Sequence, residues 1–217
     1  MTSAPSLIRV TFAVPPLGCN CTILGDPVTK QAIVVDPGGD AQRILREAKA
    51  LGLTIVGLYH THAHFDHFMA SGAMKQATGA PIYLHEADRL LWDILELQCR
   101  AFGVSQTALA PAPDHLMTDE EKILVGDHSG IALHTPGHTP GALSLSFPTE
   151  RLVLAGDTLF QGAIGRTDLW GGDFKAIERS IRERLYTLDE QTLVITGHGP
   201  ETMIGFEREE NAYIRAT

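Results

Sequence analysis

The sequence predicts an α/β protein whose helices cover a mixed or antiparallel sheet. Short apolar runs with the length of buried strands recur along the chain, and a few longer segments carry apolar residues at helical spacing. Several of the expected strands follow one another without an intervening helix. This order favours hairpins over a regular alternation of strand and helix, which would give a parallel sheet.

The first 60 residues contain four expected strands and one helix. The strand nearest the N-terminus alternates apolar and polar side chains as far as Pro15, as half-buried strands do. Asp40 is placed to cap a helix that runs through Leu51, and Gly52 follows just beyond its end. We expect the strands at residues 8–14, 21–24, 32–35 and 55–59.

The rest of the chain is expected to add two helices and six further strands. Residues 87–102 carry apolar side chains at helical spacing, which predicts one long helix, and residues 105–115 predict a loop because they contain two prolines. Asp173 is placed to cap another helix, whose apolar stripe reaches Leu188. The remaining strands are expected at residues 81–84, 122–125, 131–134, 143–147, 152–155 and 193–196.

The composition is that of an ordinary soluble protein and excludes several functional classes. The chain has 217 residues, of which 44% are hydrophobic, and a formal net charge of −9, so we expect one domain that spans residues 1–217. The acidic balance argues against nucleic acid or an anionic membrane as the main partner. Three cysteines, no visible signal peptide and no apolar run long enough for a membrane span predict a cytoplasmic protein.

The histidines are the most informative feature of the sequence. His62, His64, Asp66 and His67 lie within six residues, directly after the strand expected at 55–59. A loop at a strand end can direct such side chains into one pocket, and imidazole and carboxylate groups suit a divalent metal such as Zn²⁺. Four ligands so close together exceed what one tetrahedral ion takes from a single loop, which indicates two ions.

Three more candidate ligands stand beside glycines at the ends of apolar strands or just past them. They are His138, Asp157 and His198. Each alone would be weak evidence for a metal site, because turns often contain such residues. Together with the first motif they form a coherent set of ligands from separate parts of the chain.

Asp36 and the cysteines have other expected roles. Asp36 ends a strand, and its carboxylate could orient one of the ligand histidines. Cys19 and Cys21 share one face of a strand, but the sequence has no second cysteine pair, so we expect both to be buried as small hydrophobic residues. Cys99 lies in an amphipathic segment and is expected in the core.

In these motifs, from the turn at Asp36 to His198, the sequence resembles the metallo-β-lactamase superfamily. The resemblance implies a four-layer αββα sandwich with a metal site at one edge of two packed sheets. It also implies two divalent ions, for which zinc is expected and iron or manganese are alternatives. Carried over by motif, one ion would be held by His62, His64 and His138, the other by Asp66, His67 and His198, and Asp157 would bridge them.

Within this superfamily the stretch from Gly156 to Asp168 resembles the glyoxalase II branch, the hydroxyacylglutathione hydrolases. Part of this stretch, residues 165–168, also occurs in the related persulfide dioxygenases. True metallo-β-lactamases use a cysteine where this chain has Asp157, which argues against that subgroup. Only 19 residues follow His198, so the helical domain with which long glyoxalase II enzymes grip glutathione is expected to be absent.

The resemblance therefore implies a binuclear metal-dependent hydrolase that cleaves a thioester, with S-D-lactoylglutathione as the suggested substrate. Asp66 would both bind metal and orient the attacking hydroxide. Arg166 would contact a carboxylate of glutathione through its bidentate fork. The alternative for Arg166 is an ion pair with Asp168 or Asp173 that only holds the loop.

Other functions of the same motifs remain open at this point. One is a mononuclear iron persulfide dioxygenase that uses His62, His138 and Asp157. Others are a lactone or ester hydrolase of the same fold and a non-catalytic metal-dependent binding protein. The sequence does not fix the acyl group, the native metal or the oligomeric state.

Overall fold

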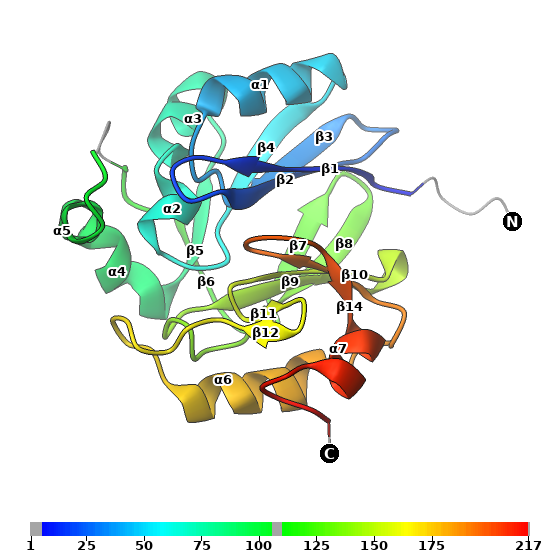
Figure 1. Cartoon of the computed structure of the whole chain (residues 1–217). Coiled ribbons are helices and arrows are strands. Elements are labelled where there is room, and N and C mark those ends of the chain that lie inside the picture. Colours follow the sequence, from blue (N-terminus) through cyan, green and yellow to red (C-terminus); the bar gives the residue numbers. More distant parts are fainter. Residues whose placement is uncertain (1–5, 106–109, 217) are drawn as a thin grey trace, which may run out of the picture.

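The chain forms four layers in the order helix, sheet, sheet, helix (Figure 1). The structure is a computed structural model that describes residues 6–105 and 110–216. Two six-stranded sheets face each other, and helices cover their outer faces. This arrangement confirms the αββα sandwich that the sequence motifs imply.

The first sheet is formed by the N-terminal strands and is mixed. Its strands are β1 (Ile8–Val14), β2 (Cys19–Gly25), β3 (Gln31–Val35), β4 (Thr54–Tyr59), β5 (Ile82–His85) and β6 (His115–Met117). They lie in sequence order across the sheet. β1, β2 and β3 pair antiparallel, whereas β3, β4, β5 and β6 pair parallel.

The second sheet has the order β14-β13-β10-β9-β8-β7 and is antiparallel except where β10 pairs with β13. Its strands are β7 (Lys122–Val125), β8 (His128–His134), β9 (Leu143–Phe147), β10 (Leu152–Gly156), β13 (Leu193–Thr196) and β14 (Thr202–Met203). A small hairpin stands apart from both sheets and consists of β11 (Leu159–Phe160) and β12 (Ala163–Ile164).

Helices α1 (Ala41–Ala50) and α3 (Ser71–Thr78) cover the first sheet, and α6 (Phe174–Ser180) covers the second (Figure 1). Asp40 and Asp173 cap α1 and α6 as the sequence predicts, because each carboxylate accepts a hydrogen bond from a backbone N–H of the first turn. The segment Ile181–Leu185 continues α6 as a wider π-helical turn. The other helices are α2 (Phe65–Phe68), α4 (Arg89–Asp93), α5 (Leu95–Ala101) and α7 (Ile204–Glu210).

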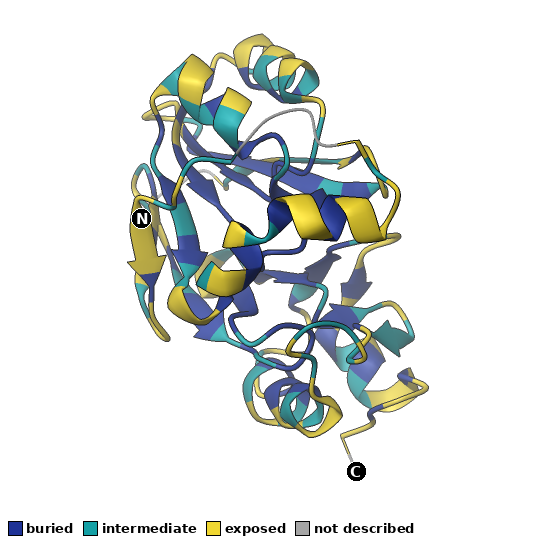
Figure 2. Ribbon diagram, turned by 90° about the vertical axis from the view of Figure 1, so that its left-hand side faces the viewer, coloured by how far each residue is buried: buried dark blue, intermediate teal, exposed yellow. Residues whose placement is uncertain are grey.

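Side chains that alternate across the strands divide the core into three layers. Val153 and Leu154 are neighbours on β10, yet Leu154 packs between the two sheets and Val153 packs toward α6 and its residue Ile177. On the other side of the molecule, Ile44 of α1 and Met74 of α3 pack onto the first sheet. Inner strands such as β9 and β10 are therefore buried on both faces, whereas the edge strands β1 and β7 carry exposed residues, as do the outer sides of the helices (Figure 2).

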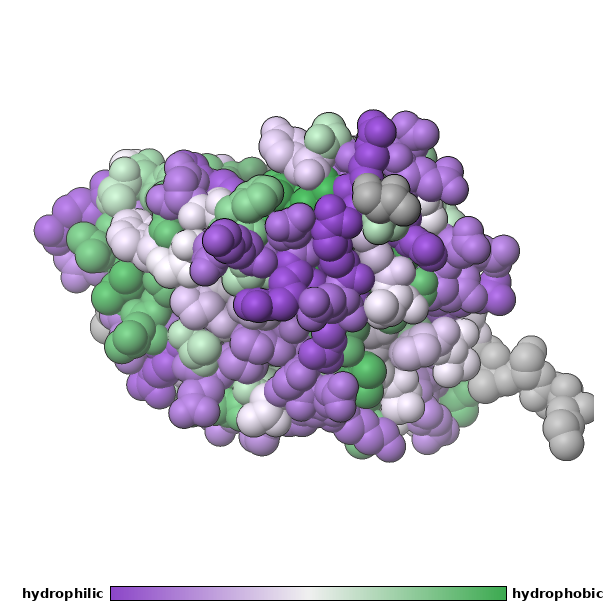
Figure 3. Space-filling view, turned by 90° about the horizontal axis from the view of Figure 1, so that it is seen from below, coloured by the Kyte–Doolittle hydropathy of each residue, from purple (hydrophilic) through white to green (hydrophobic). Residues whose placement is uncertain are grey.

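The outer surface of the second helical layer is mostly hydrophilic. Figure 3 views the molecule from this side and shows charged and polar residues over most of the face, with hydrophobic residues in separate small groups. Among residues 6–105 and 110–216, no helix is both long enough and apolar enough to span a membrane.

The prediction of one continuous helix over residues 87–102 is wrong. The segment is instead a 3-10 turn followed by α4 and α5, which are separated at Ile94, where the backbone has φ −99° and ψ 24°. The side-chain amide of Gln98 donates to the carbonyl of Leu91 over 2.7 Å and thereby satisfies a backbone acceptor at the break. The apolar spacing indicated a helix but could not show this interruption.

The loop expected at residues 105–115 is partly described. Residues 106–109 lie outside the described residues, and His115 begins β6 rather than ending a loop. Several other short elements were not predicted from the sequence, namely α2, α3, α7, β11, β12 and β14. Each of them has only two to eight residues, which is too few for a clear apolar period.

Candidate metal centre

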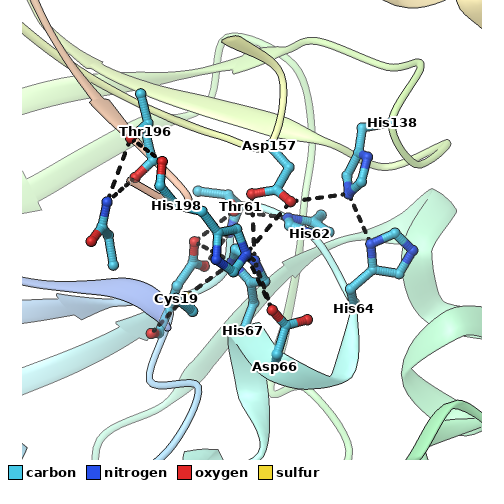
Figure 4. Close-up of polar contacts among 12 residues, drawn as sticks. Cys19, Thr61, His62, His64, Asp66, His67, His138, Asp157, Thr196 and His198 are labelled. Atoms are coloured by element: carbon cyan, nitrogen blue, oxygen red, sulfur yellow. Dashed lines mark hydrogen bonds and ion pairs between the residues drawn. The ribbon is translucent and has the colours of Figure 1, made fainter. Parts of the chain in front are cut away.

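All seven predicted ligands meet at one edge of the two sheets. The residues from His62 to His67 follow the C-terminal end of β4 and enter the short helix α2. Asp157 directly follows β10, and His198 lies two residues beyond β13. His138 comes from the loop between β8 and β9. Figure 4 shows these side chains pointing toward one another from four separate segments.

The donor atoms of these residues form overlapping groups within 4.8 Å of one another. Asp157 belongs to one of the groups and lies between the others. Its Oδ2 atom is 3.5 Å from Nε2 of His138 and 3.7 Å from Nε2 of His198. The groups are His62, His64 and His138; Asp66, His67 and His198; and His62, His67 and Asp157.

Hydrogen bonds on the far side of three histidine rings determine which nitrogen faces the centre. Nδ1 of His138 donates to the carbonyl of Arg166 over 2.8 Å, so its Nε2 carries a lone pair. Nδ1 of His67 donates to Oδ2 of Asp36 over 3.0 Å, as the sequence suggested for Asp36. Such outer hydrogen bonds fix ring orientation and increase ligand basicity in metal sites.

The same argument applies to His62. Its Nδ1 lies 3.1 Å from Oγ1 of Thr61, and this hydroxyl donates its own proton to Asp36 over 2.7 Å. The hydroxyl must therefore accept from His62, which leaves a lone pair on Nε2. That nitrogen is buried and has no hydrogen-bond partner among the described residues, as is also true of Oδ1 of Asp157. Unpartnered buried acceptors are costly unless a ligand such as a cation satisfies them.

The charge states of the histidines differ within this small volume. Burial, followed by repulsion from charge on neighbouring histidines, lowers the pKa of His64 to about 3 and that of His62 well below its usual value. Both rings are therefore neutral near pH 7 and can act as ligands. Burial also opposes charge on His67, but attraction by the carboxylates of Asp157, Asp66 and Asp36 raises the pKa of His67 well above its usual value.

The raised pKa of His67 reflects a local excess of negative charge. Asp36, Asp66 and Asp157 each place a carboxylate oxygen within 3.0 to 3.7 Å of this ring. A divalent cation would balance these carboxylates and would displace the proton from His67. The set of neutral imidazoles and carboxylates thus fits divalent metals of the zinc, iron and manganese type.

Gly197 allows the last ligand loop to approach the centre. A Cβ atom at this position would lie 1.9 Å from Oδ1 of Asp157 and 3.0 Å from Cε1 of His67. Neither contact is compatible with a larger side chain unless the ligands move. The glycine before His198 is therefore required by close packing of the loop against Asp157.

A pocket of about 190 Å³ opens onto the candidate ligands. Its walls include Leu17, Phe65, Phe102 and Leu169, and Arg166 lines it as well. The guanidinium of Arg166 donates to both carboxylate oxygens of Asp168, over 2.7 and 2.8 Å. The ion-pair alternative for Arg166 is therefore present in the structure, although the residue also borders the pocket.

Sequence reasoning missed three residues that support the ligand loops. Asp88 accepts hydrogen bonds from both histidine-bearing loops of the three-histidine group. Asn20 donates its side-chain amide to the carbonyls of Thr196 and Gly199, each over 2.9 Å, and so holds the loop of His198. The sequence offered only a weak signal for these two residues. Asp88 is a short polar residue directly before a helix, and Asn20 is one near the end of a strand.

The third missed residue is Cys19, whose Sγ lies 3.4 Å from Nδ1 of His67. Burial raises the pKa of Cys19 to about 12, so it is a neutral thiol near pH 7 and not a thiolate ligand. The prediction that Cys19, Cys21 and Cys99 are buried is confirmed. No local pattern around Cys19 indicated that it would contact a candidate ligand.

Two known proteins that are named as hydrolases are similar to this chain over most of its length. Hydroxyacylglutathione hydrolase GloC of Haemophilus influenzae is 37% identical over 199 residues, which cover 91% of this chain and 93% of that protein. The probable metallo-hydrolase YqgX of Bacillus subtilis is 40% identical over 186 residues, which cover 85% of this chain and 87% of that protein.

Solved structures are similar over nearly the whole chain. The B3 metallo-beta-lactamase BLEG-1 superimposes with a TM-score of 0.89 at 36% identity, over 95% of this chain and 99% of that chain. TTHA1623 in a di-iron-bound form gives a TM-score of 0.85 at 33% identity, over 95% and 100% of the two chains. ETHE1 from Myxococcus xanthus gives a TM-score of 0.77 at 27% identity, over 94% of this chain and 83% of that chain.

The sequence model that describes the metallo-beta-lactamase superfamily matches residues 14–198, a range that contains all seven candidate ligands. The two relatives named as hydrolases match over most of their own length as well. The fold, the ligand geometry and these matches lead to one conclusion: this chain belongs to the metallo-beta-lactamase superfamily.

Proposed function

We propose that this protein is a binuclear metal-dependent hydrolase that cleaves thioesters of glutathione. In this proposal His62, His64 and His138 hold one ion, whereas Asp66, His67 and His198 hold the other. The observation that carries it is the position of Asp157, whose Oδ2 lies at nearly equal distances from a histidine of each group. A carboxylate in that position can be shared by two ions.

The chemistry required is the addition of water to the thioester carbonyl and cleavage of the carbon–sulfur bond. Bound divalent ions would bring the pKa of a water molecule near neutrality and polarise the carbonyl group. Asp66 is suited to orient that water. Burial disfavours its ionised form, yet the charge of His67 and a hydrogen bond from His198 lower the pKa of Asp66 to about 2. It is therefore a carboxylate at neutral pH and can accept a hydrogen bond from the attacking water.

The pocket beside the ligands suits a substrate with an apolar part and an anionic end. Leu17 and Phe102 are 50% and 39% exposed at this pocket, so they offer apolar surface to a ligand. Arg166 offers a bidentate guanidinium to a carboxylate. Its pair with Asp168 is largely exposed, and such pairs contribute little stability, so a substrate carboxylate can replace Asp168. The relative named hydroxyacylglutathione hydrolase supports glutathione as the thiol.

Metal analysis and thioester hydrolysis, measured on the same purified sample, test this proposal. We expect about two zinc, iron or manganese ions per chain, in keeping with the two ligand groups. Release of glutathione from S-D-lactoylglutathione should follow the metal content when a chelator removes the ions and zinc is added back. A sample with two ions and no thiol release from any glutathione thioester would contradict the proposal.

Two alternative functions are separate outcomes of this experiment. One iron per chain, with oxygen consumed on glutathione persulfide, would identify a dioxygenase. The likeness to BLEG-1 keeps β-lactams among the substrates to be tested, although Asp157 stands where a cysteine was expected for a lactamase. Faster hydrolysis of a β-lactam than of the thioester would assign that activity instead.

A further inference from the structure

Asp88 is a completely buried carboxylate outside the set of candidate ligands. It ends the 3-10 turn Glu86–Asp88 that follows β5. Its Oδ2 atom accepts hydrogen bonds from the backbone N–H of Ala63 over 2.9 Å and from the hydroxyl of Thr139 over 2.8 Å. Its Oδ1 atom accepts from the backbone N–H of Gly141 over 2.5 Å. Three donors thus converge on one buried acidic side chain.

These donors belong to two loops that are far apart in the sequence. Ala63 stands between His62 and His64, and Thr139 directly follows His138. A single carboxylate therefore joins the backbone of both loops that carry the three-histidine group. The ring nitrogens of that group lie within 4.8 Å of one another, so a small shift of one loop would change their spacing.

Gln98 of α5 reinforces the first of these loops. Its Oε1 accepts from the backbone N–H of Phe65 over 3.1 Å, and its Nε2 donates to the carbonyl of Ala63 over 2.9 Å. Like Asp88, Gln98 is completely buried. Polar groups at such depth need partners, which makes these hydrogen bonds costly to lose and the loop conformation correspondingly well defined.

We propose that Asp88 is a positioning residue for the three-histidine metal site. It holds the loop of His62 and His64 in register with the loop of His138, so that the three rings are arranged before an ion binds. This inference rests on the proposed function only in taking the three histidines as ligands. Asp88 touches neither substrate nor ion, and its role is to keep the affinity of this one site high.

The structure also supplies a matched control at the other site. Asn20 holds the loop of His198 through two backbone carbonyls, but makes no hydrogen bond to the loops that Asp88 joins. Glu207 is a second control. It is completely buried and accepts hydrogen bonds from Gly162, Thr202 and Asn211, away from the candidate ligands.

The test is a titration of chelator-treated, full-length protein with Zn²⁺ against a chromophoric competitor. His64→Ala and His198→Ala define which of the two binding steps belongs to which site. Asp88→Asn keeps the shape of the side chain but replaces one acceptor oxygen by an amide donor. We expect Asp88→Asn to lower the zinc affinity of one binding step, the step that His64→Ala removes, by about ten- to a hundredfold. Loss of an outer hydrogen-bond partner typically has that effect on metal affinity.

Asn20→Ala should instead weaken the step that His198→Ala removes. Glu207→Gln should lower the unfolding temperature and leave both zinc affinities within about twofold, since changes distant from a site act independently of it. Thr139→Val removes one of the three donors and should weaken the same step as Asp88→Asn, by a smaller factor. This variant keeps the test available even if Asp88→Asn does not fold.

Two results would overturn the inference. One is an unchanged zinc affinity of the three-histidine site in folded Asp88→Asn and Thr139→Val. The other is an equal loss at both sites, which would indicate general destabilisation. Either result would leave the proposed function intact. A wild-type protein that binds no zinc, or binds it without involvement of His64 and His198, would instead overturn the proposed metal assignment itself.

Discussion

The Nδ1 atom of His138 donates a hydrogen bond to the carbonyl oxygen of Arg166 over 2.8 Å. The backbone and the side chain of Arg166 therefore have different roles. The backbone of Arg166 fixes the ring of a candidate ligand, and its side chain borders the adjoining pocket. A change of the Arg166 side chain can therefore probe substrate binding without removing the hydrogen bond to His138.

We predict that Arg166→Ala raises the KM for a glutathione thioester by about tenfold or more, because a charge-assisted hydrogen bond contributes roughly 1.5–3 kcal/mol. Metal content and unfolding temperature should stay unchanged, since the exposed pair with Asp168 contributes little stability. An uncharged thioester without the peptide should be cleaved as by the wild type. Steady-state kinetics on both substrates provide the measurement.

Asp168→Asn is the matched control for this prediction. It releases Arg166 from its ion pair and should leave the KM for the glutathione thioester unchanged or lower it. Equal losses on the charged and the uncharged substrate in Arg166→Ala would show that the residue acts through the loop. No loss on either substrate would remove the anchor role altogether.

Asp157→Ala should remove the carboxylate shared by the two groups of ligands. It leaves His138 and His198 without the oxygen that lies 3.5 and 3.7 Å from their Nε2 atoms. We expect fewer bound ions by elemental analysis and a fall in turnover of at least about a hundredfold, as for loss of groups that hold a metal site together. Full activity of a metal-loaded Asp157→Ala protein would contradict the bridging assignment.

Gly197→Ala should be far more damaging than Gly199→Ala, although both lie in the loop of His198. The added Cβ at Gly197 would overlap Oδ1 of Asp157, whereas the same atom at Gly199 meets nothing within 4 Å. Gly199 has a φ of +73°, so its alanine variant should lose about 1–2 kcal/mol of stability from backbone strain alone. Metal content should fall in the first variant and persist in the second. Equal metal content in both would show that the loop adapts to the clash.

Stability should fall as the pH is lowered from about 6.5 to about 4 because of His85. Burial, together with the nearby ring of His134, lowers the pKa of His85 from 6.5 to about 4. Within this window the unfolded chain binds a proton that the folded chain excludes, so acid favours unfolding; above pH 6.5 the contribution is fully present. Nδ1 of His85 also accepts from the N–H of Ala87, which requires the neutral ring.

His85→Asn keeps an acceptor for Ala87 but does not titrate. Urea unfolding of metal-free protein should therefore show a shallower loss of stability between pH 6.5 and 4 in this variant than in the wild type. Metal-free protein is used so that release of ions at low pH does not contribute. Parallel curves for the two proteins would exclude His85 as a source of the pH dependence.

Local chemistry predicted most of the regular elements. Residues 32–35 and 152–155 are apolar throughout and lie in β3 and β10. These runs could be recognised because the two strands are buried on both faces. Asp40 and Asp173 predicted the starts of two helices, because a carboxylate can cap free backbone N–H groups. The break at Ile94 was not predicted, because the side-chain hydrogen bond from Gln98 to the carbonyl of Leu91 depends on the backbone conformation at Ile94, which the apolar spacing does not record.

The sequence by itself determined the fold family and the chemistry of the metal centre, since imidazoles and carboxylates beside strand ends have a recognisable composition and spacing. Only the tertiary structure decided which groups support them. Asp88 lies 25 residues from Ala63 and 53 from Gly141, and Asn20 lies 176 from Thr196. A buried carboxylate or amide takes its role from the donors and acceptors that packing brings to it, and no local pattern records those partners.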